Sequence, residues 1–237
     1  MIDNSLADRL ALVTGASRGI GAAIAESLAS RGAHVVLVGR TVGGLEEVEE
    51  RIHKAGGSAT IAPLDLVDGD SIDRLAAAIA GCWKALDILV LNAAILGSLT
   101  PVAALDAKEF GRVLTLNVGS QAALIAAFDS LLKGSDRARV LAVTSSVGRN
   151  PRAYWAGYGA SKAAMETLVE CYGLESQAIS SIRTAIVDPG AVATAMRAKA
   201  FPGEDPETIK QPVVVGDAVA KLIVDDFENG TRIRINA

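Results

Sequence analysis

A tyrosine and a lysine that could together move a proton, Tyr158 and Lys162, lie four residues apart. On the helix that we predict to begin at Ala156, this spacing places both side chains on one face. A free phenol has a pKa of about 10, and a neighbouring ammonium group stabilises the phenolate and lowers that value. The pair is therefore predicted to act as an acid/base, although the same spacing is also frequent in helices that only pack against a core.

A glycine-rich segment, residues 14–21, stands between the first predicted strand and the first predicted helix. Glycines at such a position allow a tight turn and let a pyrophosphate approach the helix N-terminus closely. This placement favours a dinucleotide-binding turn over an ordinary glycine-rich connection, which a lone glycine motif often is. The predicted contact residues are Gly15, Ser17, Arg18, Gly19, Ile20 and Gly21.

The residue at the end of the second predicted strand decides which dinucleotide is preferred, since an acidic residue there would bind the ribose 2′-hydroxyl of NAD and repel a 2′-phosphate. That residue is Arg40, and Arg18 adds a second guanidinium group from the glycine-rich turn. The forked guanidinium suits a phosphate dianion. We therefore expect NADP as the cofactor, with NAD less favoured. The alternative is that both arginines are solvated surface charges.

Short apolar runs alternate with helical patterns along the chain, which is typical of βαβ units. The predicted strands span residues 10–13, 35–38, 59–63, 88–91, 140–143, 184–187 and 232–235. The predicted helices span residues 22–30, 45–54, 72–80, 108–132, 156–179 and 217–227. The fold class that follows is α/β: a single Rossmann-type doubly wound domain over residues 1–237, with a seven-stranded parallel sheet.

Residues 191–212 show no clear periodicity and contain Pro202, Pro206 and Pro212. They follow the sixth predicted strand, and in an open parallel sheet ligands bind beyond the carboxyl ends of the strands. We therefore expect this segment to be a substrate loop that closes over a bound ligand.

The composition excludes several classes of function. Half of the 237 residues are hydrophobic but only 4% are aromatic, which suits strands covered on both faces. A formal net charge of −4 and a pI near 5.3 argue against a nucleic-acid partner, which would normally require a basic face. Residues 1–5 show no leader pattern and no stretch of 18 apolar residues occurs, so we expect a cytoplasmic protein that does not bind membranes.

The cysteines and histidines do not predict a metal site. Cys82 and Cys171 are far apart in the chain, and neither has a second cysteine or a cluster of histidines nearby. His34 and His53 have no carboxylate or thiol at a metal-binding spacing. We expect reduced thiols, structural or solvated histidines and no bound metal.

Six motifs occur in the order and spacing of one known family, and the chain resembles the single-domain short-chain dehydrogenase/reductase family. They are the glycine-rich turn, Asn92-Ala93-Ala94, Asn117, Ser145, the segment 158–162 and the segment 189–194. Within the family, residues 146–149 and 196–202 most resemble a poorly characterised bacterial branch of reductases. The resemblance implies an oxidoreductase that transfers a hydride between NADP(H) and a small carbonyl or alcohol substrate, and it points to a homotetramer or homodimer.

The resemblance also assigns roles by position. Tyr158 would donate or accept the proton, Lys162 would lower its pKa and hold the nicotinamide ribose, Ser145 would orient the substrate oxygen, and Asn117 would support a proton relay. The other implied cofactor contacts are Asp65 and Leu66 near the adenine, Asn92 and Ala93 in the cleft, and Pro189, Gly190, Val192 and Thr194 at the nicotinamide end. Asp65 could instead only begin a helix, and Thr194 could be an ordinary loop hydroxyl.

Two departures from the family pattern bear on the pocket. Leu91-Asn92-Ala93-Ala94 stands where Asn-Asn-Ala-Gly is commoner, which predicts a slightly bulkier cleft wall, and the chain stops at Ala237, where many relatives continue. Tyr154 and Trp155 precede the catalytic tyrosine in a chain poor in aromatics. They could line the pocket, or they could pack at the helix start or in a subunit contact.

Two other functions compete with the reductase. A non-catalytic NADP-binding regulator or scaffold would keep the fold without turnover, but the intact Asn117, Ser145, Tyr158 and Lys162 count against it. A nucleotide-sugar epimerase or dehydratase would have a different glycine spacing and a larger substrate domain than this length allows. The sequence does not identify the substrate.

Overall fold

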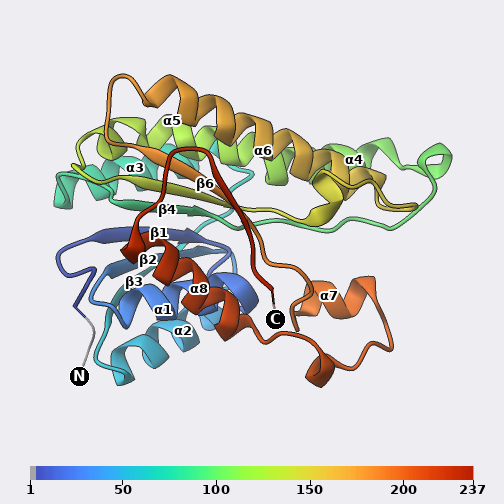
Figure 1. Cartoon of the computed structure of the whole chain (residues 1–237), viewed down its shortest axis with the longest axis horizontal. Helices are drawn as coiled ribbons and strands as arrows, with labels where there is room; N and C mark the ends of the chain where they lie inside the picture. The colour runs from blue at the N-terminus through green and yellow to red at the C-terminus, as the bar shows by residue number, and fades with distance from the viewer. Residues whose placement is uncertain (1–3, 237) are drawn as a thin grey trace.

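The seven strands form one parallel sheet in the computed structural model, which describes residues 4–236 (Figure 1). Residues 1–3, part of the segment that lacks a leader pattern, and residue 237, the chain end noted above, lie outside the described residues. The strand order is β3-β2-β1-β4-β5-β6-β7. The strands are β1 Leu10–Thr14, β2 His34–Gly39, β3 Ser58–Pro63, β4 Ile88–Leu91, β5 Arg139–Val143, β6 Arg183–Asp188 and β7 Thr231–Arg234.

The central strands are covered on both faces. All residues of β1, β4 and β5 are buried, which is why their sequences are continuous apolar runs rather than alternating patterns. In register, Val13 lies between Leu37 of β2 and Val90 of β4. The predicted α/β fold class, a Rossmann-type doubly wound parallel sheet of seven strands, is confirmed.

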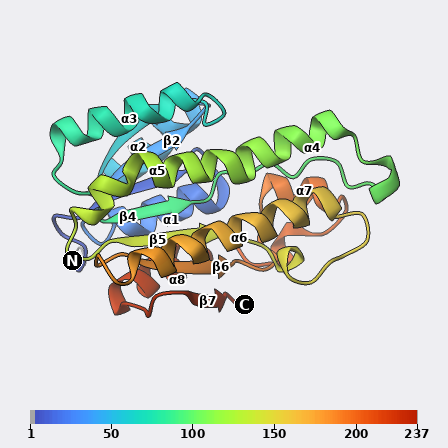
Figure 2. The same ribbon diagram turned by 90° about the horizontal axis from the view of Figure 1, so that it is seen from above.

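Two layers of helices cover the sheet. One face carries α1 Gly19–Ala29, α2 Val42–Lys54 and α8 Pro212–Asp225, and the other carries α3 Gly69–Cys82, α5 Ser120–Lys133 and α6 Ala156–Ser176. The remaining helices are α4 Ala107–Leu114 and α7 Ala195–Ala200. Both views place α4, α7 and the start of α6 at the same end of the molecule (Figures 1 and 2).

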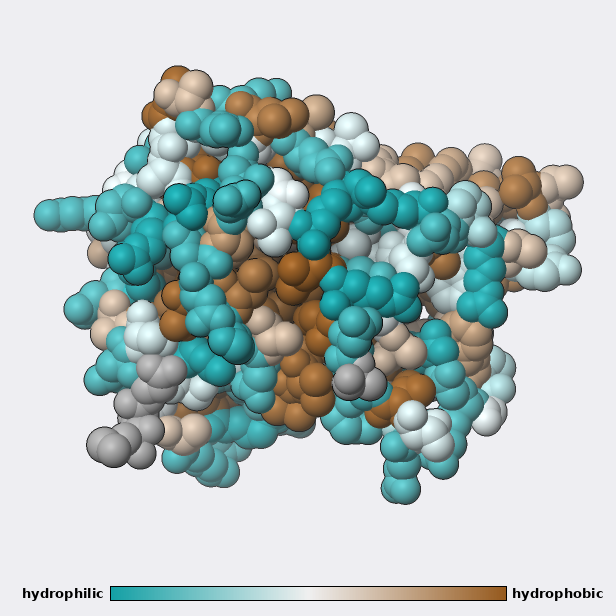
Figure 3. All heavy atoms as spheres, viewed as in Figure 1, coloured by the Kyte–Doolittle hydropathy of each residue, from teal (hydrophilic) through white to brown (hydrophobic). Residues whose placement is uncertain are grey.

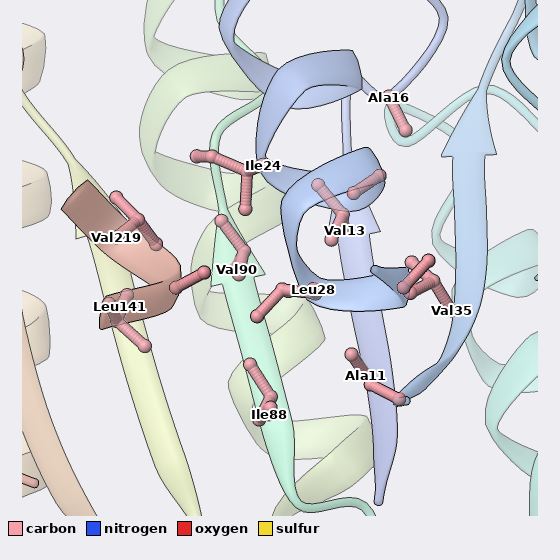
Figure 4. Close-up of a cluster of buried hydrophobic side chains, with 14 of the residues drawn as sticks. Ala11, Val13, Ala16, Ile24, Leu28, Val35, Ile88, Val90, Leu141 and Val219 are labelled. Atoms are coloured by element: carbon pink, nitrogen blue, oxygen red, sulfur yellow. The ribbon is translucent and has the colours of Figure 1, made fainter. Parts of the chain in front are cut away.

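Each face of the sheet has its own apolar core. In the first, Ile24 and Leu28 of α1 and Val219 of α8 pack on Val90 and Leu141 of the sheet (Figure 4). The second core lies between the sheet and α3, α5 and α6. On the face seen in Figure 3, apolar residues gather near α8, where Val213 and Val214 are exposed. No helix of the described chain has the length and hydropathy to cross a bilayer.

A third, smaller apolar cluster lies away from both cores. It contains Leu96, Val147 and Tyr158, which follow or face the carboxyl ends of β4 and β5. Trp155 and Met196 pack against it from the start of α6 and from α7. This cluster marks the end of the molecule where the strands terminate.

Three predicted elements differ notably from the structure. The helix predicted over residues 108–132 is divided into α4 and α5 by a π-helical segment, Thr115–Gly119, a local widening that often occurs at functional sites. The loop predicted over residues 191–212 contains α7 and a 3₁₀ turn, Pro206–Thr208. The last helix begins at Pro212 instead of Asp217, because proline fits the first helical position, where its missing N–H is not needed.

Candidate active site

The glycine-rich turn connects β1 to α1 in a conformation that side chains would prevent. Gly15 and Gly19 have positive φ values of 66° and 60°. A Cβ atom on Gly21 would lie 2.3 Å from the carbonyl oxygen of Gly15 and 2.6 Å from the side-chain Nδ2 of Asn92. The first turn of α1 contains no acidic residue, and Arg18 precedes it. The turn therefore fits a pyrophosphate, since the backbone can approach it and no carboxylate repels it.

Thr14, which was not among the predicted contact residues, connects this turn to the end of β4 by hydrogen bonds. Its hydroxyl donates to the Val90 carbonyl (3.0 Å) and accepts from the backbone N–H groups of Asn92 (2.9 Å) and Ala93 (3.1 Å). The Asn92 side chain in turn donates to the Thr14 carbonyl (2.8 Å). Thr14 opens the glycine motif, so its position could have suggested a role, but only the fold brings β4 beside it.

Two of the residues predicted to contact the adenosine end follow neighbouring strands. Arg40 follows β2 and Asp65 follows β3, and the Arg40 guanidinium lies 3.9 Å from the Asp65 carboxylate. Both are exposed, at 66% and 49% of the side chain, so the guanidinium is accessible to a ligand. Arg18 is also exposed. The hydroxyl of Ser120 donates to the Leu66 carbonyl (2.6 Å), which fixes the segment after β3.

Ser17 sits between the turn and α2. A Cβ atom on Gly44 would lie 3.1 Å from the Ser17 carbonyl oxygen. Ile20 packs against the first core. These contacts hold the start of α1 and the start of α2 side by side, next to Arg40.

Asn117 is fully buried in the π-helical segment and ties three parts of the site together. Its side chain accepts from the backbone N–H of Ile95 and donates to the carbonyl of the same residue, both at 2.9 Å. It also donates to the hydroxyl of Ser161 (3.0 Å), which donates to the Tyr158 carbonyl (2.7 Å). Ser161 was not predicted as a site residue, although it lies inside the 158–162 motif. The network positions α6 against the segment after β4.

Tyr158 and Lys162 share one face of α6, as predicted, and both are buried. The Lys162 ammonium donates to the Val143 carbonyl (2.8 Å) and lies 5.7 Å from the centre of the Tyr158 ring. Burial lowers the pKa of Lys162 to about 8, against the opposing field of Glu166. Burial, aided by the Asp188 carboxylate, raises the pKa of Tyr158. This direction is opposite to the lowering expected from Lys162, because loss of solvent around the phenol outweighs the ammonium.

Ser145 begins the segment after β5 in an extended conformation, and its carbonyl accepts from the Gly148 N–H (3.0 Å). No hydrogen bond to the Ser145 or Tyr158 hydroxyl occurs within residues 4–236. Glu166, one turn beyond Lys162, accepts from the hydroxyl of Thr144 and from Arg149 (3.1 Å) and Arg232 (2.7 Å). Glu166 thus fixes the segment that carries Ser145. The amino-acid sequence alone did not indicate this role.

The Glu166 carboxylate stays ionised in this position. Burial opposes the charge, but the hydrogen bonds from Thr144, Arg232 and Arg149 outweigh burial and lower the pKa of Glu166 below its usual value. The ion pair is therefore a permanent brace at neutral pH.

The segment after β6 is anchored by Lys210. The Lys210 ammonium donates to the carbonyls of Pro189 (3.0 Å) and Ile235, and Val192, which is buried, forms a parallel bridge with Lys210. Gly190 has a positive φ of 69°. The two ends of the predicted loop are thus held together by the bridge between Val192 and Lys210. The residues between these ends include α7 and the 3₁₀ turn.

Thr194 caps α7 by accepting from the Arg197 N–H (3.1 Å). Its methyl group faces Gly19, where an added Cβ atom would lie 3.4 Å away. The segment after β6 therefore meets the glycine-rich turn directly, and the cofactor contacts predicted on the two segments lie opposite each other.

Trp155 and Tyr154 take different positions. Trp155 is half-buried and packs edge-on against Tyr158, with ring centres 6.2 Å apart. Tyr154 has a positive φ of 73° and 59% of it is exposed. The strained backbone at Tyr154 turns the two neighbouring rings apart, so that Trp155 alone joins the apolar cluster beside Tyr158.

His34 makes structural contacts, whereas His53, Cys82 and Cys171 are exposed. The His34 ring stacks on Trp83 at 5.2 Å and bonds to the hydroxyls of Ser58 and Thr60. In the part of the chain that the structure describes, no three histidine, cysteine or acidic side chains come close enough to hold a metal ion.

Comparison with known proteins agrees with this geometry. Residues 9–205 match the family model described as short chain dehydrogenase. The uncharacterized oxidoreductase YciK of Escherichia coli K12 is 35% identical over 235 residues, covering 98% of this chain and 92% of YciK. A structure from Escherichia coli CFT073, complexed with NADPH, is 34% identical, covers 99% of each chain and has a TM-score of 0.93.

A more distant structure agrees as well. A metagenomic short-chain oxidoreductase in complex with NADP is 32% identical, with 98% of this chain and 100% of that chain covered and a TM-score of 0.83. The match of the family model over most of the chain, together with these relatives, shows that this protein belongs to the short-chain dehydrogenase/reductase family.

Proposed function

We propose that the protein is an oxidoreductase that transfers a hydride between NADP(H) and a carbonyl or alcohol substrate. The observation that carries this proposal is the buried polar assembly at the edge of the sheet where the glycine-rich turn also lies: Asn117 is linked through Ser161 to Tyr158, and Lys162 is bonded to the Val143 carbonyl at the end of β5. Similar structures that contain NADP or NADPH support the cofactor. A non-catalytic binding role would leave this buried polar assembly without a purpose.

The residues present fit the cofactor. The glycine-rich turn (Gly15, Ser17, Gly19, Ile20 and Gly21) would hold the pyrophosphate, and Arg18 and Arg40 would bind the 2′-phosphate, with Arg40 leaving its long contact to Asp65. Asp65 and Leu66 would lie near the adenine, and Asn92 and Ala93 near the cleft floor. Pro189, Gly190, Val192 and Thr194 would contact the nicotinamide end. The bound cofactor supplies the hydride.

The residues of this chain handle the proton. In the direction of reduction, Tyr158 donates its hydroxyl proton to the carbonyl oxygen, which Ser145 orients by a hydrogen bond. The raised pKa of Tyr158 keeps this proton on the phenol until a substrate oxygen accepts it. Lys162 holds the nicotinamide ribose and supplies positive charge beside the phenolate that forms. Asn117 fixes the start of α6 and supports a path for proton return.

Residues 191–212 are proposed to close over the substrate. Their two ends are fixed by the Val192–Lys210 bridge, so that α7 can move as a unit between fixed points. A cytoplasmic location remains part of the proposal, and the net charge of −4 supports the absence of a nucleic-acid partner. A homodimer or homotetramer is supported by the exposed Leu174, Val213 and Val214 on α6 and α8. Light scattering that gives 24.4 kDa at micromolar concentration would contradict the oligomer.

The test is NADPH oxidation with a panel of carbonyl compounds, followed by Tyr158→Phe with any substrate found. The variant keeps the ring and removes the proton, so we expect normal folding and NADPH binding but at least a 100-fold loss of turnover, as general acid catalysis supplies about 10²–10⁴. Lys162→Met should lose both turnover and cofactor affinity. A Tyr158→Phe enzyme with more than a tenth of wild-type turnover would show that the proton comes from another group.

A further inference from the structure

A row of aromatic rings leads from the proposed proton donor to the rim of the site. The Tyr158 ring lies 6.2 Å from Trp155, and Trp155 lies 5.7 Å from Phe201, measured between ring centres. Trp155 and Phe201 are tilted by only 33° to each other. The three rings come from α6, the residue before it and the end of α7, so the proposed substrate loop completes the row.

The surroundings of this row are apolar. Leu96 and Val147 are buried beside Tyr158, and Leu99 and Met196 pack against them. These side chains offer no hydrogen-bonding group to a ligand, and burial of apolar surface stabilises a complex by about 25 cal/mol per Å². A ligand that reaches Tyr158 along this row is therefore expected to have a flat, apolar body.

Two guanidinium groups, those of Arg197 and Arg152, lie against the rings of this row. Among the described residues, only the first is paired with a carboxylate. Arg197 lies 3.6 Å from the centre of the Phe201 ring, and Glu204 neutralises it through two hydrogen bonds of 2.5 and 2.6 Å. Arg152 lies 5.2 Å from the Phe201 ring centre and 6.0 Å from that of Trp155. Within residues 4–236, no carboxylate pairs with Arg152.

Arg152 is held at this position by local structure. The Trp155 N–H donates to the Arg152 carbonyl (3.1 Å), which closes a turn directly before α6. The Tyr154 carbonyl accepts from the Thr100 N–H (3.1 Å), which ties the same turn to the segment after β4. Arg152 is exposed beside the Trp155 and Phe201 rings, and no carboxylate of residues 4–236 neutralises it. Such a guanidinium suits a carboxylate ligand, because the two groups form charge-assisted, bidentate hydrogen bonds.

Building on the proposed function, we propose that the substrate is a carbonyl compound with a flat, apolar body and a carboxylate at the end distant from the carbonyl. The body lies along Trp155 and Phe201, and Arg152 binds the carboxylate. Arg152 is then a specificity residue, remote from the atoms that react.

Binding to the full chain loaded with NADP⁺ tests this without requiring turnover. The probes are biphenyl-4-carboxylate and its neutral carboxamide, which have almost the same shape, and their affinities are measured by calorimetry. We expect the carboxylate to bind at least tenfold more tightly, about 1.4 kcal/mol. In Arg152→Met the two affinities should become equal, with that of the carboxamide unchanged within twofold, whereas Arg152→Lys should keep part of the preference.

Two controls locate the effect. Lys84→Met removes an exposed cation between α3 and β4 and should leave the tenfold preference intact. The chain has two tryptophans, and Trp83 stacks on His34 at β2, so Trp83→Phe leaves Trp155 as the only tryptophan emitter. Its emission should change on titration with biphenyl-4-carboxylate.

The outcomes separate the two proposals. Equal affinity for the two probes in the wild type, a preference that survives Arg152→Met, or no binding of either probe would each overturn the assignment of Arg152 while leaving the reductase activity standing. Failure of every carbonyl compound to oxidise NADPH would instead count against the proposed function.

Discussion

At the glycine-rich turn the backbone itself forms the binding surface, whereas at α6 the surface consists of side chains held by buried hydrogen bonds. The turn depends on absent atoms: Gly21 has no room for a Cβ, and Gly15 adopts a positive φ. The start of α6 depends on present atoms, since Asn117, Ser161 and Lys162 each make buried polar bonds. The first kind of site tolerates no added atom, and the second tolerates no lost hydrogen-bond partner.

Among the substitutions considered, Gly21→Ala at the glycine-rich turn is expected to reduce stability and cofactor binding most. The added methyl group would overlap the Gly15 carbonyl oxygen, which belongs to the backbone and has no flexible end to move. We expect the free energy of unfolding to fall by more than about 3 kcal/mol and NADPH binding to become undetectable by nicotinamide fluorescence. Gly43→Ala is the matched control, because nothing lies within 4 Å of its added Cβ; it should be neutral or slightly stabilising, since alanine favours helix. Normal NADPH affinity in Gly21→Ala would show that the turn is not built by close packing.

Asn117→Ala tests the other region, the buried side-chain hydrogen bonds at the start of α6. The substitution leaves both backbone groups of Ile95 without their side-chain partner and removes the donor to the Ser161 hydroxyl, which keeps its own bond to the Tyr158 carbonyl. Each buried unsatisfied group costs about 1–3 kcal/mol, so we expect the free energy of unfolding in urea to fall by about 3 kcal/mol. Ser161→Ala removes the bonds to Asn117 and to the Tyr158 carbonyl but leaves both Ile95 groups paired, and it should cost about 1 kcal/mol. If the two variants were equally stable, the network would not hold the site together in the way described.

The buried charge of Lys162 should make the free energy of unfolding depend on pH. The pKa of Lys162 is lowered to about 8 in the folded protein from its usual value of about 10.4. The unfolded chain therefore binds more protons between about pH 8 and pH 10, and the stability of the wild type relative to Lys162→Met should rise across this window by about 2 kcal/mol. Below pH 8 the variant should be the more stable of the two.

Chemical denaturation of both proteins at pH 7, 9 and 10, without cofactor, measures this difference. Lys199→Met, which removes an exposed lysine, should show no such pH dependence. A constant difference between Lys162→Met and the wild type would mean that the lysine is not desolvated.

The smallest expected effect belongs to Arg40, a flexible side chain at the edge of the backbone-built site. Arg40→Asp places a carboxylate beside Asp65 and should reverse a preference for NADPH over NADH that we expect to be at least tenfold, about 1.4 kcal/mol. Lys84→Asp, an exposed charge change elsewhere, should leave the ratio unaltered. Equal affinities of the wild type for the two cofactors would remove Arg40 from the cofactor site.

The same contrast explains what the sequence could predict. The strands and the glycine-rich turn follow from local patterns, because buried apolar runs and steric gaps restrict residue types position by position. The spacing of Tyr158 and Lys162 is likewise local. Each of these is decided within a few residues of the chain.

The partners of the buried polar groups could not be predicted in this way. Thr14 pairs with residues 78 and 79 positions later, and Glu166 pairs with Arg232, 66 positions later. The π-helical segment at Asn117 also escaped prediction, because its apolar spacing resembles that of an uninterrupted helix. The raised pKa of Tyr158 depends on how completely the fold removes water, which residue spacing does not reveal.

The brace at Glu166 also has a consequence for the order of folding. Thr144 and Arg149 come from the segment around Ser145, but Arg232 comes from β7, which is synthesised after the other six strands of the sheet. Contacts between residues far apart in sequence form late, because a long loop must close before they are made. We therefore expect a nascent chain to assemble its nucleotide-binding half first and to lock the Ser145 segment only when β7 has joined the sheet.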